Sequence, residues 1–325
     1  MTDNNNQMVL QAIDRLIIAA VPERRTDLDA LWQRYAPQFV LSEDGPRFVM
    51  TAGAFSSVIY SNKTLLQIWL LGFAAWRAVE AYADIISSCA AMGLPFDPPS
   101  VAALPGQSSV DAAFDRTLTA AEEVGQIDNL ASFSWPTNVP QPGTESFSDP
   151  DKAAHDLVCV ATAYFFLHEL KHVAFRIDED APSDPVAEEI ACDRFAREFL
   201  LSGIPTFAAE IGITADEVRA KRVAAIALAT FVIVAVTPPE AWGGTGSHPA
   251  LTQRFRDTFE TVAIARTAYP WNVGSALLLA KLRASGRPIP QFVFADEQTL
   301  FEQLISLLSD DIGSSTRGSS PRRSV

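Results

Sequence analysis

The chain has 325 residues, a formal net charge of −14 at pH 7 and 48% hydrophobic residues. This length is enough to bury a sizeable core without disulfide staples. The negative charge opposes nucleic acid and anionic membrane surfaces, so we expect neither as a partner. The first residues lack a basic stretch followed by an apolar core, so a cytoplasmic location is expected.

The three cysteines are widely spaced and odd in number, which indicates buried thiols in a reducing compartment rather than a disulfide framework. Cys89 and Cys159 fit this interpretation without an alternative. Cys192 could instead bind a metal, although packing is the interpretation we favour.

The N-terminal part combines helices with the most β-like segments of the chain. Two short helices are predicted, over Met8–Ala20 and Thr26–Gln38. Phe39–Leu41 and Phe48–Met50 flank a loop that contains Gly and Pro, which predicts a hairpin. Ser57–Tyr60 could add a strand. Any sheet should therefore be small and N-terminal.

The middle of the chain is predicted to be helical and rich in loops. Asn62–Met92 is a long, aromatic-rich helix, a proline-rich loop follows, and Ala112–Val124 forms a further helix. The residues from Ser132 to Pro150 include four prolines and mark a boundary or a long surface connection.

Two apolar runs, Leu65–Trp76 and Val223–Val236, could suggest membrane insertion. Both are shorter than the roughly 20 residues that span a bilayer, so we predict buried core helices.

The C-terminal half begins with an apolar helix that starts at Asp149-Pro150 and is apolar nearly all round, which predicts a central position. Asp184-Pro185 starts the next helix, and Thr214 and Glu217 form a capping box for a third. A helix from His248-Pro249 to about Ala265 follows.

These patterns divide the chain into three regions. Residues 1–135 are a helical and β region that forms part of a cleft, 150–312 are a helical core, and 313–325 are a disordered tail rich in Ser, Arg and Gly. The predicted fold class is mainly α (α+β), with a helical core and a small N-terminal β-sheet or hairpin.

A His-Glu-x-x-His pattern lies at the end of the apolar helix. On a helix, His168 and His172 lie one turn apart on one face and can bind one metal ion, with Glu169 beside them as general base. Catalytic zinc takes three protein ligands and keeps one position open for water. Glu189 is the predicted third ligand. Asp193, one turn later, is predicted to accept a hydrogen bond from a ligating imidazole.

A later histidine completes the predicted site. His248 precedes Pro249 at a predicted helix start, where donors and positive potential collect, and this suits a donor to an oxyanion. Arg254, in the same helix, could support His248 or pair with an acidic residue of the site. His155 lies too far around the helix from His168 to join it and is interpreted as structural or exposed.

Taken together, these motifs resemble those of the gluzincin zinc metallopeptidases, over about Ala153 to Phe259. The His-Pro and Arg element is similar to that of the HtpX and CAAX-prenyl-protease group. A soluble chain of about this length with a long N-terminal part also resembles the phage-exclusion protease Lit family, bacterial proteins implied to cleave elongation factor Tu. The HtpX group has clear transmembrane helices, whereas here only Val223–Val236 approaches one. The resemblance therefore implies a zincin-like helical core without a membrane anchor.

The predicted function is that of a zinc-dependent endopeptidase that hydrolyses a protein or peptide substrate, with Glu169 as general base and Zn²⁺ as cofactor. A strand at Phe48–Met50 or Ser57–Tyr60 could hold the substrate by edge pairing. One alternative is a non-catalytic regulatory or binding protein with a structural zinc, whose closed shell Cys192 or Asp193 would complete. Another is a membrane-associated protease similar to the HtpX group.

Overall fold

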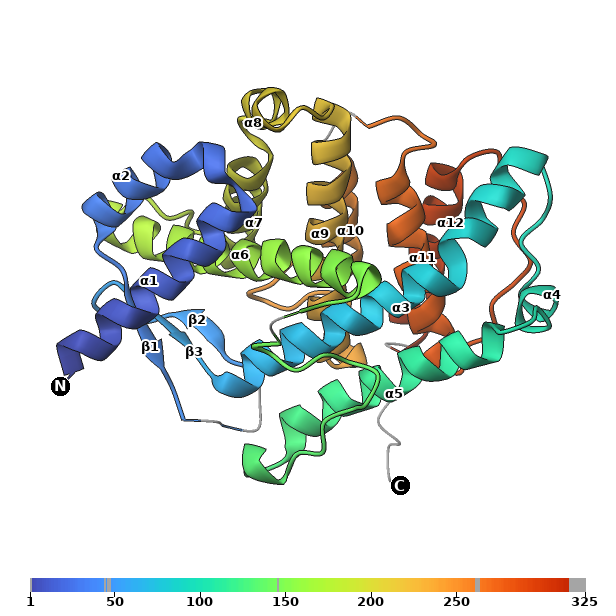
Figure 1. The fold of residues 1–325 in the computed structure, drawn as a ribbon, viewed down its shortest axis with the longest axis horizontal. Helices are drawn as coiled ribbons and strands as arrows, with labels where there is room; N and C mark the ends of the chain where they lie inside the picture. The colour runs from blue at the N-terminus through green and yellow to red at the C-terminus, as the bar shows by residue number, and fades with distance from the viewer. Residues whose placement is uncertain (1, 44, 46–47, 145, 261–263, 316–325) are drawn as a thin grey trace, which may run out of the picture.

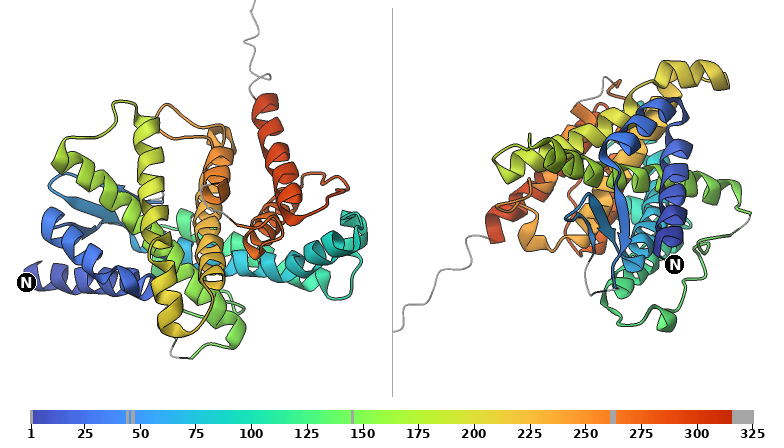
Figure 2. Two further views of the ribbon diagram at one scale, coloured as in Figure 1. Left: turned by 90° about the horizontal axis from the view of Figure 1, so that it is seen from above. Right: turned by 90° about the vertical axis from the view of Figure 1, so that its left-hand side faces the viewer.

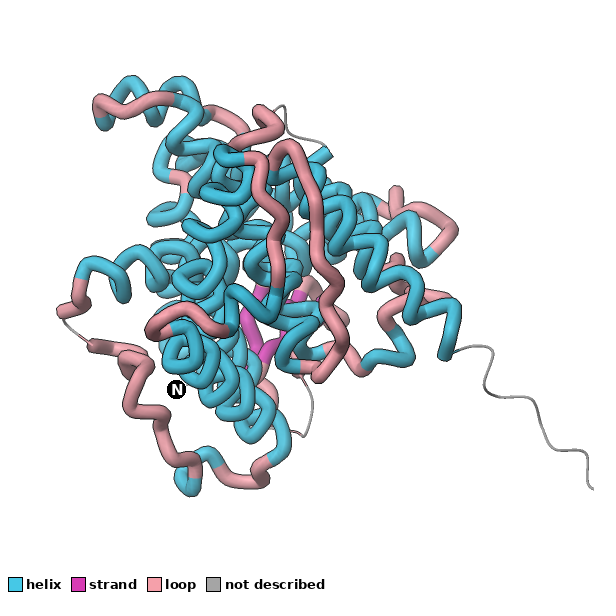
Figure 3. The backbone as a smooth tube through the Cα atoms, turned by 90° about the vertical axis from the view of Figure 1, so that its right-hand side faces the viewer, coloured by secondary structure: helices cyan, strands magenta, loops and turns pink. Residues whose placement is uncertain are grey.

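The computed structural model describes residues 2–43, 45, 48–144, 146–260 and 264–315. Helices make up most of the molecule, and a small sheet lies beside the N-terminal helices (Figure 1). Figure 3 shows the strands as a small patch enclosed by helical segments. The predicted mainly α fold with a small N-terminal sheet is confirmed.

The elements follow in chain order around a long central helix, and a long connection over residues 127–148 joins α5 to α6, as predicted for the proline-rich segment. The α-helices are α1 (Thr2–Ala20), α2 (Arg25–Tyr35), α3 (Asn62–Met92), α4 (Pro98–Ala102), α5 (Gln107–Gln126), α6 (Asp149–Asp178), α7 (Pro185–Leu201), α8 (Ile204–Ile211), α9 (Ala215–Val236), α10 (Leu251–Glu260), α11 (Tyr269–Ala284) and α12 (Glu297–Ser315). The strands are β1 (Gln38–Leu41), β2 (Met50–Ala52) and β3 (Ser57–Tyr60).

Side-chain caps start the helices that build the site. Asp184 caps α7 ahead of a proline, as its sequence predicts. Thr214 and Glu217 form the predicted capping box of α9, with hydrogen bonds in both directions. The start of α6 differs from the prediction, because the hydroxyl of Ser148 is the cap and Asp149 is the first helical residue.

Helix α6 is the centre of the molecule. It packs against α1, α3, α7 and α9 and against β2 and β3, as the crossing helices in Figures 1 and 2 show. Most of its residues from Ala154 to Phe175 are buried. Side chains from Ile13 near one end to Leu308 near the other form one continuous hydrophobic cluster with it. A helix surrounded in this way holds its side chains in fixed positions.

The sheet has the strand order β1-β3-β2. β3 is central and pairs in parallel with β1 and antiparallel with β2. The predicted hairpin between Phe39–Leu41 and Phe48–Met50 is therefore wrong: β3 lies between these segments, and the second strand is Met50–Ala52. β2 is an edge strand that lies against α6.

Several further boundaries differ from those predicted. α1 begins at Thr2 rather than Met8, α2 ends at Tyr35 rather than Gln38, and α5 is Gln107–Gln126 rather than Ala112–Val124. A short helix, α4, lies in the predicted proline-rich loop. α10 begins at Leu251, after the predicted start, and ends at Glu260 within the described residues; 261–263 lie outside them. The predicted tail, 313–325, overlaps α12 by three residues, and 316–325 lie outside the described residues.

Within the described ranges, α6 is the one helix long and apolar enough to cross a membrane by length and composition. However, 78% of its most apolar window is buried inside the protein. The runs Leu65–Trp76 and Val223–Val236 lie in α3 and α9, and most of their side chains belong to the core, as predicted.

Gly72 lets α3 approach α6 closely, because a Cβ atom there would clash with Cγ2 of Val158. Replacing a helical glycine by alanine usually stabilises a helix by about 1 kcal/mol. Here we expect Gly72→Ala to lower the free energy of unfolding by about 1–3 kcal/mol, the usual cost of overpacking. Chemical denaturation measures this difference.

The control is the double variant Gly72→Ala/Val158→Ala, which removes the clash. It should be more stable than the sum of the two single effects predicts. If the changes in unfolding free energy of the two single variants simply add in the double variant, the close contact of α3 with α6 at these positions is contradicted.

Candidate active site

The last turns of α6 hold the His-Glu-x-x-His pattern at the floor of a cleft. His168 and His172 lie one turn apart on one face, and their Nε2 atoms are 3.2 Å apart. His168 is buried, and apolar residues of the core cluster precede it on the helix. Burial fixes both rings, so they face the same point.

Glu189 of α7 brings a carboxylate to that point. Its Oε2 lies 3.5 Å from Nε2 of His168, and its Oε1 lies 3.2 Å from Nε2 of His172. The candidate ligand atoms of these three residues lie within 4.8 Å of one another. Ligand atoms about 2.1 Å from a tetrahedral zinc lie roughly 3.4 Å apart. The two nitrogens and the carboxylate are therefore of the right type, and close enough together, to hold one metal ion.

Each imidazole is held from behind by a second carboxylate. Nδ1 of His168 lies 2.9 Å from Oδ1 of Asp193, and Nδ1 of His172 lies 2.7 Å from Oε1 of Glu188. An ionised carboxylate can only accept, so each Nδ1 carries the hydrogen and each Nε2 is left for a metal.

Two further side chains support the carboxylates. The hydroxyl of Tyr164 donates to Oδ1 of Asp193 at 2.9 Å. Arg254 of α10 donates to Oε2 of Glu189 at 2.7 Å and to Oδ1 of Asp193 at 3.2 Å. Of the two roles predicted for Arg254, pairing with acidic residues of the site is the one these contacts describe.

The charges of the cluster favour a cation. Burial alone would lower the pKa of His168, but hydrogen bonds to Asp193 and Glu189 outweigh it and raise that pKa to about 10. Burial would raise the pKa of Glu189, but hydrogen bonds from His168 and His172 hold it well below its usual range. The acids therefore favour a positive charge at this point, and a divalent cation can replace the proton that His168 would otherwise hold.

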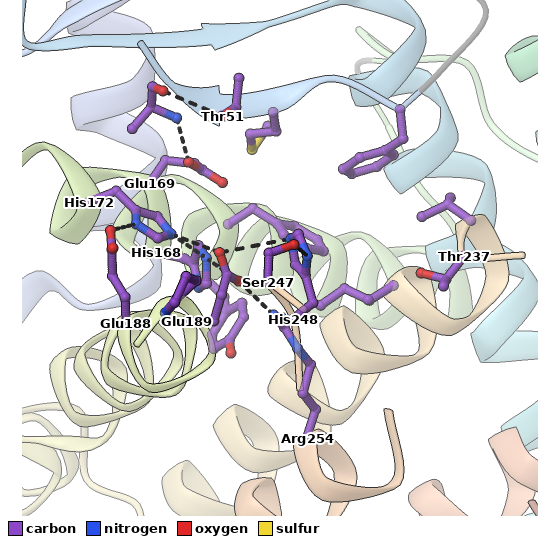
Figure 4. A pocket seen from close by; sticks show the side chains of 18 of the residues that line it. Thr51, His168, Glu169, His172, Glu188, Glu189, Thr237, Ser247, His248 and Arg254 are labelled. Carbon is purple, nitrogen blue, oxygen red and sulfur yellow. Dashed lines mark hydrogen bonds and ion pairs between the residues drawn. The ribbon is translucent and has the colours of Figure 1, made fainter. Parts of the chain in front are cut away.

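Glu169 points to the opposite wall of the cleft, which β2 forms (Figure 4). Its Oε2 accepts a hydrogen bond of 2.6 Å from the backbone N–H of Ala52. Burial raises the pKa of this carboxyl group, which is the direction that a general base at neutral pH requires.

His248 lies at the rim of the cleft and not at a helix N-terminus, because α10 begins three residues later. This part of the prediction is wrong, since the backbone turns once more before the helix starts. The ring is 59% exposed, its Nδ1 lies 2.8 Å from Oγ of Ser247, and its Nε2 lies 3.9 Å from Oε1 of Glu189. His248 therefore faces the cluster across a short gap.

The cleft has a volume of about 520 Å³ and contains the whole cluster except Asp193. β2, α6, α7, the end of α9 and the segment before α10 form its walls. Apolar side chains, among them Phe48, Phe165 and Val236, line the rest.

Cys192 and Asp193 do not join the group of candidate ligands in the described part of the chain. Asp193 contacts the Nδ1 side of His168, away from the point that both Nε2 atoms face. Burial raises the pKa of the Cys192 thiol, which disfavours the thiolate that metal binding requires. This arrangement gives no support to a closed shell of four protein ligands.

Three hydrogen-bonding groups of the site were not predicted from the sequence: the carboxylate of Glu188, the hydroxyl of Tyr164 and the backbone N–H of Ala52. Tyr164 lies four residues before His168, so helical spacing could have suggested it. Glu188 precedes the predicted ligand directly, and its role depends on how α7 lies against α6. The bond from Ala52 joins residues 117 positions apart, and no local pattern indicates it.

Comparison with known proteins adds one match. A model of the family described as peptidase U49 matches residues 58–274, which is two thirds of the chain. The matched range runs from β3 into α11 and includes every side chain of the cluster. No curated protein and no solved structure matches the chain.

Arg254 offsets the charge of two buried carboxylates, and its side chain is only 8% exposed. After chelation of any metal, we expect Arg254→Met to lower the free energy of unfolding by about 3 kcal/mol, because buried acids lose their cation. Arg266→Met is the matched control, since Arg266 and Asp296 form an exposed pair worth about 1 kcal/mol or less. Equal losses in the two variants would contradict this role of Arg254.

Proposed function

This chain belongs to the peptidase U49 family and is a peptidase, and we propose that it is a zinc-dependent endopeptidase that hydrolyses a protein substrate. The observation that carries the proposal is the cluster of His168, His172 and Glu189, with Glu169 beside it. Two imidazoles, one carboxylate and an adjacent glutamate are the parts of a hydrolytic zinc site.

His168, His172 and Glu189 would hold the ion. When Zn²⁺ is bound there, it supplies polarisation of the scissile carbonyl and a lower pKa for a water molecule. Asp193 and Glu188 keep the two imidazoles in the orientation that ligation requires.

Glu169 is the proposed general base. The N–H of Ala52 holds one of its oxygens, and in the described residues Glu169 has no other hydrogen bond. The second oxygen can therefore accept a proton from the attacking water and return it to the leaving amine.

His248 is the proposed donor to the oxyanion. Its exposed ring lies close to Glu189 at the rim, and Ser247 contacts its Nδ1. If Nδ1 accepts from the serine hydroxyl, Nε2 carries the hydrogen and can donate to the developing charge. Arg254 lies behind Glu189 and keeps that carboxylate in place.

The proposed substrate strand pairs with β2. The alternative at Ser57–Tyr60 is excluded, because β3 has a partner strand on each side. β2 lines the cleft and has a free edge, toward which the N–H of Ala52 points. An extended peptide on that edge would run past Glu169. A cytoplasmic location, and the absence of membrane and nucleic-acid partners, stay predictions.

The first test measures metal content and proteolytic activity on the same proteins. We expect about one zinc ion per chain in the purified protein, and a loss of cleavage on chelation. Glu169→Gln should keep the metal and lose about 10²- to 10⁴-fold in rate, because it removes the base but preserves the shape. Metal analysis and proteomics of a treated cell lysate measure both.

His172→Ala is the matched control and should lose the metal together with the activity. Wild-type protein without stoichiometric metal at micromolar concentration would overturn the proposal.

The second test concerns the oxyanion donor. His248→Ala should lower kcat by about 10²- to 10³-fold, as removal of such a donor does in other hydrolases. Its metal content should not change. His155→Ala, which removes a histidine outside the cleft, is the control for general damage. Loss of the metal from His248→Ala would instead indicate a ligand.

A further inference from the structure

A second hollow adjoins the cleft and contains none of the residues proposed for catalysis. Its volume is about 640 Å³, and it shares Phe48, Val236 and Pro238 with the lining of the cleft. The far walls are Gln67 of α3 and the last turns of α5. We call this hollow the side chamber.

The polar lining of the side chamber is acidic or neutral. Glu122, Gln126 and Gln67 contribute it, and no cationic side chain lines it in the part of the chain that the structure describes. Glu122 is exposed and forms no ion pair or hydrogen bond with another described residue, although its charge acts on Lys281. A carboxylate is therefore left to interact with an incoming cation.

Gln67 provides an independent second observation. It is only 7% exposed, and its Nε2 donates to the carbonyl of Ala121. Its Oε1 has no hydrogen-bond partner among the described residues. A Cβ at position 125 would lie 2.7 Å from Nε2 of Gln67, so glycine leaves room for this amide. Buried acceptors are usually paired, so an unpaired one on a residue that lines a cavity calls for a donor from outside the chain.

The distance along β2 and the two residues before it relates the side chamber to the scissile bond. Ala52 contacts the proposed base, and Phe48, at the border of the chamber, lies four positions earlier in the chain. An extended substrate rises about 3.3 Å per residue, so it would reach Phe48 about four residues from the scissile bond.

We propose that the side chamber binds a lysine or arginine side chain of the substrate, about four residues from the bond that is cut. The inference rests on the proposed endopeptidase function. Apolar walls at Phe48 and Val236 take the methylene groups of the side chain, and Glu122 meets its charge. Oε1 of Gln67 accepts one of its hydrogens after a small adjustment of the amide.

The test compares cleavage of a synthetic library of random peptides long enough to span the cleft. In the wild type we expect lysine and arginine to be enriched about two- to fivefold at one fixed position, the range for one partly exposed ion pair. Glu122→Lys should abolish this preference or replace it by one for acidic residues. Glu123→Lys makes the same charge change on a neighbouring exposed residue outside the chamber and should keep it.

A binding measurement separates this proposal from the proposed function. The same library is passed over immobilised Glu169→Gln protein, and over the protein with Glu122→Lys or Glu123→Lys added. Basic peptides should be retained on Glu169→Gln and on Glu169→Gln/Glu123→Lys, but not on Glu169→Gln/Glu122→Lys. This result does not depend on whether the wild type cleaves any peptide. Equal retention on all three, or equal loss with both lysine variants, would overturn the side-chamber proposal. Absence of cleavage with selective retention would overturn only the endopeptidase proposal.

Discussion

The site depends on one buried interaction, the contact of Arg254 with Glu189 and Asp193. Two carboxylates with little access to water would repel each other and would gain protons without a cation between them. The guanidinium lowers the pKa of Asp193, and it acts together with the hydrogen bonds from His168 and His172 to lower that of Glu189. Its planar shape also fixes the relative positions of the two carboxylates. Because Arg254 belongs to α10 while both acids belong to α7, this contact also joins the two helices. The same hydrogen bonds therefore stabilise the two buried carboxylates and hold α10 against α7.

The central helix explains why the two histidines can be held so firmly. α6 is surrounded by α1, α3, α7 and α9, so its last turns cannot shift without disturbing the whole core. The cluster thus has a rigid floor, while the rim at His248 and the wall at β2 are formed by short segments. Ligands fixed by a packed helix suit a site that must keep its geometry.

The features that depend only on neighbouring residues were predicted correctly from local sequence patterns. The spacing of His168, His172, Glu189 and Asp193 follows from helical periodicity, and the caps at Asp184 and Thr214 require only neighbouring residues. The strand order depends on which segments meet in space, so alternation of apolar residues could not show that β3 lies between the other two strands. The bond between Ala52 and Glu169 escaped prediction for the same reason. The position of His248 was missed because a proline permits a helix start without requiring one.

The bond from Ala52 to Glu169 has a consequence for the solubility of the chain. An exposed sheet edge is a template on which any extended segment can form a ladder, including one from a second copy of the same protein. β2 is only three residues long, and its outward N–H at Ala52 is taken by a side chain of the same molecule. Few backbone groups therefore remain for a chance partner. A substrate strand on this edge would have to compete with Glu169 for the N–H of Ala52, and the same competition disfavours pairing with a second copy of the chain.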